Sequence, residues 1–79
     1  MFKVRVTVKG PFDTNAFDRP VDMDFHPETF SDALMAAYVL TDDHVKRIYG
    51  GFGGFTPNGY GYSFVTSNGT VVSYKVSEV

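Results

Sequence analysis

The sequence predicts an α+β fold in which one helix packs on one face of an antiparallel, five-stranded sheet, in the order ββαβββ. Three observations lead to this prediction. Apolar residues recur at helical spacing in one convincing segment, residues 27–40. Much of the remaining chain alternates between polar and apolar residues, as half-buried strands do. Near the C-terminus, Asn68-Gly69 separates two such stretches, which is typical of a β-hairpin.

The composition is that of one folded domain of 79 residues, with 43% hydrophobic and 20% charged residues. Cysteine is absent, which excludes a disulfide framework and a thiolate zinc site and fits a reducing cytoplasm. The N-terminus alternates charged and apolar residues, unlike a signal peptide, and no apolar run approaches the ~20 residues that span a bilayer. We therefore expect a cytoplasmic protein without a membrane partner. The net charge of −2 argues against a broad basic surface for nucleic acid.

Two alternating stretches at the N-terminus, residues 2–9 and 16–25, predict an antiparallel hairpin. Pro20 lacks the N–H of a strand ladder, so the second strand is expected at a sheet edge or with a bulge. Its inner face would carry Phe17, Val21, Met23 and Phe25. Its outer face would carry an aspartate row, which consists of Asp18, Asp22 and Asp24. Opposite it, the first strand would present a basic row of Lys3, Arg5 and Lys9.

The helix is expected to begin near Pro27, because Thr29 and Asp32 have the spacing of a capping box. One helical face would contact the sheet through Phe30, Ala33, Leu34, Ala37 and Tyr38. Apolar residues also occupy the flanks, where a surface helix usually carries Lys or Glu: Met35, Ala36, Val39 and Leu40. The helix is therefore either covered on more than one side or offers apolar surface to a partner.

The helix is expected to stop by Thr41, because Asp42-Asp43 suit the negative end of a helix dipole poorly. Residues 44–49 then alternate and predict a short third strand. The alternative is a helix that continues through Ile48.

The register of the C-terminal hairpin follows from the length of its loop. If Asn68 and Gly69 are the two loop residues, Val65 faces Val72 and Tyr62 faces Lys75. The core would then contain Val65, Val72, Tyr74 and Val76. An aromatic row, which consists of Tyr60, Tyr62 and Phe64, would point outward.

The aspartate row is the first candidate contact surface. Its carboxylates would repeat every two residues along a strand, about 6.6–6.8 Å apart, and Asp42-Asp43 would extend the negative surface. Such a row would imitate a phosphate backbone and engage a groove lined by Lys and Arg. The alternative is that these carboxylates neutralise the basic row across the hairpin.

The aromatic row is the second candidate. With Lys75 beside it, this row would stack the bases of single-stranded nucleic acid or serve as a protein-binding hot spot. The alternative is a register one residue away, which turns the same rings into the core beneath the helix.

The glycine-rich stretch of residues 49–62, which contains Phe52 and Phe55, is the third candidate. No Gly-Lys-Ser/Thr follows it, so it is not a phosphate-binding loop of the Walker type. We interpret it as either an adaptable binding loop or an irregular connection between strands.

We expect no enzyme activity, cofactor or metal. His26 and His44 stand near carboxylates but lack metal-ligand spacing, so we interpret His26 as a residue at the helix start and His44 as a surface residue. The serines lack a nucleophile elbow or a neighbouring base.

In kind, the chain resembles the small orphan proteins that phages encode to disable host defences, anti-CRISPR proteins above all. The shared traits are 79 residues, one α+β domain, no cysteine, the aspartate row, and an aromatic-glycine segment with Phe52, Phe55, Tyr60 and Tyr62. The resemblance implies a stoichiometric inhibitor that occupies a surface of a CRISPR effector where target DNA would lie. The net charge of −2 favours a local patch over mimicry of DNA by the whole surface.

The sequence therefore predicts a non-enzymatic, monomeric or weakly dimeric protein that blocks a host protein or nucleoprotein complex. Its partner-binding residues would be Asp18, Asp22, Asp24, Phe52, Phe55, Tyr60, Tyr62 and Phe64. One alternative is a single-stranded nucleic-acid binder that uses the aromatic row with Lys75. Another is an assembly subunit that buries Met35, Val39 and Leu40 in an oligomer.

Overall fold

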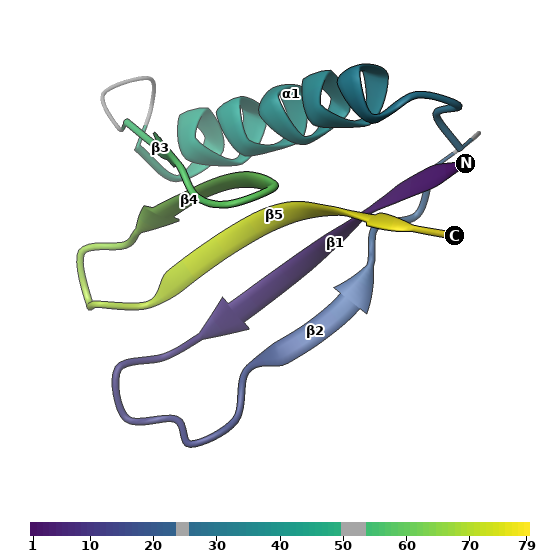
Figure 1. Ribbon diagram of the computed structural model, residues 1–79. Coiled ribbons are helices and arrows are strands. Elements are labelled where there is room, and N and C mark those ends of the chain that lie inside the picture. The colour runs from purple at the N-terminus through teal and green to yellow at the C-terminus, as the bar shows by residue number, and fades with distance from the viewer. Residues whose placement is uncertain (24–25, 50–53) are drawn as a thin grey trace.

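The computed structural model describes residues 1–23, 26–49 and 54–79. The helix α1 lies across one face of a five-stranded sheet whose strands follow the order β2-β1-β5-β4-β3 (Figure 1). Every pair of neighbouring strands is antiparallel. The elements are β1 (Phe2–Lys9), β2 (Phe17–Pro20), α1 (Phe30–Tyr49), β3 (Thr56–Pro57), β4 (Gly61–Val65) and β5 (Val71–Glu78). The predicted α+β fold and the order ββαβββ are confirmed.

The first hairpin forms as predicted, but its second strand is much shorter than residues 16–25. β2 ends at Pro20, which cannot donate to a strand ladder, and it is an edge strand as that proline indicates. The chain then turns toward the helix (Figure 1). The Val21 N–H donates to the Val4 carbonyl at 2.8 Å, and Val21 and Met23 pack against the core from this connection. Phe25 lies outside the described residues.

Phe17 lies beyond the part of the sheet that the helix covers. It pairs with Val8 and so faces the helix side of the sheet, as predicted. However, α1 contacts β1, β4 and β5 but not β2. Phe17 is consequently 55% exposed and is not a core residue.

The start of α1 follows the capping signal. The Asp32 backbone N–H donates to Thr29 Oγ1 at 3.1 Å, which satisfies one of the free N–H groups of the first turn. Pro27 is buried just before the helix, and its carbonyl accepts the Phe2 N–H at 2.8 Å. The helix start is thereby tied to the first strand.

The end of α1 differs from the prediction. The helix does not stop by Thr41 but continues to Tyr49, so the predicted strand over residues 44–49 is wrong and the helical alternative is correct. Asp42 pairs with Lys46 at 2.9 Å and Asp43 with Arg47 at 2.7 Å, both four residues apart with the acid first. Pairs in this orientation stabilise a helix by roughly 0.2–0.5 kcal/mol each. Because the helix ends at Tyr49, both aspartates also lie outside its last turn, where a negative charge would be unfavourable.

The third strand is therefore a different segment. β3 comprises Thr56 and Pro57, which pair with Ser63 and Tyr62 of β4. This short edge strand lies within the glycine-rich stretch, so residues 58–60 of that stretch are a connection between β3 and β4.

The C-terminal hairpin has a three-residue loop in place of the predicted two-residue loop. The Gly69 N–H donates to the Thr66 carbonyl at 3.0 Å, and the Thr66 N–H donates to the Thr70 carbonyl at 2.8 Å. Gly69 has φ +90, which glycine adopts without strain and which closes the bulge of such loops. The observed register pairs Phe64 with Val72 and therefore slips every predicted pairing by one residue.

The core consists of two neighbouring clusters between the helix and the sheet. The first contains Val4, Ala33, Ala37 and Val76. The second contains Val45, Phe64 and Val72. Tyr74 packs against both clusters. The helix contributes Ala33 and Ala37 to the first cluster and Val45 to the second, where Val45 packs with Phe64.

Candidate functional site

The aspartate row does not form one free acidic surface. Asp18 Oδ1 lies 2.9 Å from Arg5 Nε, so this carboxylate neutralises one member of the basic row, as the alternative interpretation holds for that pair. Asp22 is exposed, has no ion-pair partner among the described residues, and stands beyond the end of β2. Asp24 lies outside the described residues. The predicted extension is also neutralised, because Asp42 and Asp43 pair along the helix.

The aromatic row does not point outward, and the alternative register is the correct one. Phe64 is a core residue with 4% exposure, and Tyr62 is half-buried. Tyr62, Tyr38 and Phe55 form a triangle of edge-to-face ring contacts with centroid distances of 5.1–5.7 Å. Tyr60 is 69% exposed, and its ring touches the edge of Phe30.

The glycine-rich stretch contains two phenylalanines that were predicted to bind a partner, and the structure describes one of them, Phe55. Phe55 is half-buried and packs on the second core cluster as well as on Tyr62. Phe52 lies outside the described residues. The placed ring thus anchors the connection to the core.

His44 is a half-buried residue, so its interpretation as a surface residue is wrong. Its Nδ1 lies 2.7 Å from the hydroxyl of Tyr74, and its ring touches the edge of Phe64. A helix that continues past Thr41 brings His44 onto the same face as Ala37, and this spacing is the signal that could have revealed it. His26, by contrast, is exposed near the helix start.

The face of the sheet that α1 leaves uncovered is basic. β1 places Lys3, Arg5 and Lys9 on this open face, and the β1–β5 register places Lys75 directly opposite Arg5. Like charges in directly opposed positions destabilise a sheet. Among the described residues Asp18 is the acid paired with this group, so the open face keeps an excess of positive charge.

Small hydroxyl side chains surround these cations. The registers align Thr7, Ser73, Ser63 and Thr56 in one row across four strands of the open face. The described strand residues on this face include no aromatic ring. Ser73 is buried, so the face offers positive charge, the hydroxyl groups of Thr7, Ser63 and Thr56, and the exposed side chains of Val65 and Val71, without a stacking platform.

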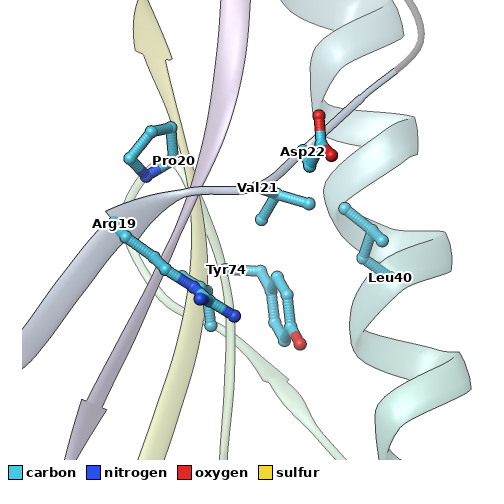
Figure 2. Close-up of a pocket in the computed structure, with 7 residues that line it drawn as sticks. Arg19, Pro20, Val21, Asp22, Leu40 and Tyr74 are labelled. Atoms are coloured by element: carbon cyan, nitrogen blue, oxygen red, sulfur yellow. The ribbon is translucent and has the colours of Figure 1, made fainter.

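A hollow opens on the opposite side, between β2 and the helix (Figure 2). Its volume is about 430 Å³, and it is lined by Val6, Arg19, Pro20, Val21, Asp22, Leu40 and Tyr74. Arg19 and Tyr74 extend into the space between the strand and the helix, while Leu40 forms the helical wall (Figure 2). A second hollow of about 370 Å³ shares Leu40 and Tyr74 and includes His44 and Arg47.

Tyr74 lines both hollows and brings a hydroxyl group to them. Burial raises the pKa of its phenol above the ordinary value, the charge of Asp43 acts in the same direction, and Arg47 and Arg19 oppose it. The phenol is therefore neutral at physiological pH and serves as a hydrogen-bonding partner for His44. This arrangement can bind and orient a group, but it does not supply a phenolate.

The described residues contain no group of three or more His, Cys, Asp or Glu side chains that could hold a metal ion. In the same part of the chain, no helix is both long and apolar enough to cross a membrane. Comparison of the sequence with protein-family models, curated proteins and solved structures gives no match. The candidate sites accordingly stand on geometry and charge alone.

Proposed function

We propose that this chain is a non-enzymatic binding protein whose open sheet face contacts the phosphate backbone of a nucleic acid. The observation that carries the proposal is the placement of Lys75 opposite Arg5, with Lys3 and Lys9 on the same face. Adjacent like charges cost stability, and a bound polyanion would relieve that cost.

The remaining side chains of the open face support backbone recognition. Phosphate oxygens accept hydrogen bonds from Ser and Thr as well as from Lys and Arg, and the hydroxyl row lies beside the cations. Sequence-tolerant stacking needs aromatic rings, and the described strand residues carry theirs on the helix side. The proposal is therefore binding with little sequence preference and a strong dependence on salt.

The second candidate is the inhibitor of a CRISPR effector complex that the resemblance implies. The observation that favours it is the exposed carboxylate of Asp22, which pairs with no cation in the described part of the chain, together with the exposed ring of Tyr60. Both are residues predicted to contact a partner. In this proposal these groups meet a basic, nucleic-acid-binding surface of the effector, and the partner is a host protein or nucleoprotein complex.

The test is fluorescence anisotropy with labelled single-stranded and duplex oligonucleotides over a range of salt concentrations. Four phosphate contacts would give a slope of roughly −3 to −4 for the logarithm of affinity against that of salt concentration. Lys75→Glu should weaken binding, because it reverses a charge at the centre of the open face. Arg47→Glu is the matched control, because it changes the net charge equally but lies on the helix.

Equal binding by both variants, or no binding at low salt, would contradict the proposal. An effector complex offered in place of free oligonucleotide separates the two candidates. Binding that requires the effector and is lost in Asp22→Lys, but not in Lys75→Glu, would support the inhibitor.

A further inference from the structure

The outer side of α1 carries an apolar centre with opposite charges at its ends. Met35 and Val39 point away from the sheet and are 63% and 57% exposed. Asp32 lies in the first turn and Lys46 in the last turn, on the same side of the helix. We call Asp32, Met35, Val39 and Lys46 the outer stripe. No other element covers this side of the helix in the described part of the chain (Figure 1).

The outer stripe is complementary to itself. Asp32 precedes Val39 by seven residues, and Lys46 follows it by seven, which is about two helical turns in each direction. Two such helices that pack antiparallel and cross at Val39 would place Asp32 of each copy against Lys46 of the other. A parallel pair would instead oppose aspartate to aspartate and lysine to lysine. The charge pattern therefore selects one orientation.

We propose that a second copy of this chain binds the outer stripe, so that two α1 helices pack antiparallel in a symmetric dimer. A self-complementary patch of this kind is what a twofold interface requires. Lys46 already pairs with Asp42 at 2.9 Å, and its exposed ammonium group has further N–H donors for the Asp32 carboxylate of the other copy. Asp43, which would lie near Met35 of the other copy, is neutralised by Arg47 at 2.7 Å.

The expected dimer is weak. A single pair of 20-residue helices offers less area than a standard interface of about 800 Å² per partner. Its mass in solution should therefore depend on protein concentration. The two open sheet faces would point away from each other, so dimerisation leaves the proposed nucleic-acid surface free.

Sedimentation equilibrium over a range of concentrations tests the proposal with charge-reversed variants. In a dimer of the Asp32→Lys variant, positions 32 and 46 of opposite copies are both lysine at each end of the interface. In a dimer of the Lys46→Glu variant, the same two positions are both acidic. Each variant alone should be monomeric at concentrations where the original chain dimerises. Equimolar mixing of the two variants should restore dimers, because each lysine at position 32 then meets a glutamate at position 46, and the second end keeps its original pair.

The double variant Asp32→Lys/Lys46→Glu should also dimerise by itself, and circular dichroism melts confirm that every variant is folded. A monomeric original chain, unchanged association of the single variants, or a mixture that stays monomeric would each overturn the proposal. Mass is measured without nucleic acid, so this result is independent of the oligonucleotide binding proposed above.

Discussion

The two faces of the sheet differ in what determines their residues. On the helix side, Phe64, Tyr62 and Tyr74 contact rings and aliphatic groups from several elements. On the open face, Lys75 is exposed and lies opposite Arg5, which is half-buried and pairs with Asp18. The comparison teaches that the helix side carries the stability of the fold, whereas the open face is free to carry binding.

The largest expected effect is that of Phe64→Ala on the helix side. Removing this buried ring leaves a cavity beneath the C-terminal half of α1 and should lower the free energy of unfolding by about 3–5 kcal/mol. Urea denaturation measures the loss. Tyr60→Ala is the matched control, because this exposed ring should cost about 1 kcal/mol or less. Equal losses would contradict the observed register of β4.

The Tyr74 hydroxyl should contribute less. Tyr74→Phe leaves His44 Nδ1 without its partner and should lower the free energy of unfolding by about 1 kcal/mol near neutral pH. Chemical denaturation of the original chain and the variant under the same buffer conditions measures this difference.

The same substitution should change the response to alkaline pH. Burial raises the pKa of Tyr74 in the folded state, so the folded state favours the neutral phenol. That contribution is complete below the ordinary tyrosine pKa of about 10 and is lost as the pH rises through the raised value. Thermal melts between neutral and strongly alkaline pH should therefore show a steeper loss of stability in the original chain than in Tyr74→Phe. Parallel curves would show that the phenol is not buried.

On the open face, Asp18→Asn should cost only about 0–1 kcal/mol, because its pair with Arg5 is partly exposed. The loss should shrink as salt is added, since screening weakens exposed ion pairs. Denaturation midpoints at low and high salt measure this trend, and a loss that persists at high salt would point to a packing role for Asp18.

The smallest effect on stability is expected for Lys75→Glu. This change places an acid opposite Arg5 and should leave the free energy of unfolding unchanged or raise it by a few tenths of a kcal/mol. The same variant is expected to lose oligonucleotide affinity. Stability and binding would then move in opposite directions, and a variant that simply unfolds would contradict the division between the two faces.

Local signals predicted several features of the fold. The alternation in residues 2–9 gave β1 with its bounds, and the Thr29 capping signal located the start of α1. Pro20 indicated the edge strand. Each of these features is determined by residues that are close together in the sequence, so a short sequence pattern is enough to predict it.

The candidate site was less accessible to prediction. Tyr74 of β5 lies beside His44 of α1 and lines the same hollow as Arg19 of β2. These three segments are far apart in the sequence, so no local pattern predicts that they meet. The basic row was visible in β1, but its extension to Lys75 required the register between β1 and β5.

By itself, the sequence determined that residues 2–9 and the two arms of the C-terminal hairpin are extended, where the helix starts and that a turn lies at Asn68-Gly69. Only the tertiary structure decided that residues 44–49 are helical and that the aromatic row turns toward the helix. The physical reason is that a two-residue loop and a three-residue loop have similar local energies. Choosing between them shifts the strand register by one residue, which exchanges the two faces of the strand. Packing of Tyr62 and Phe64 beneath α1 selects between them.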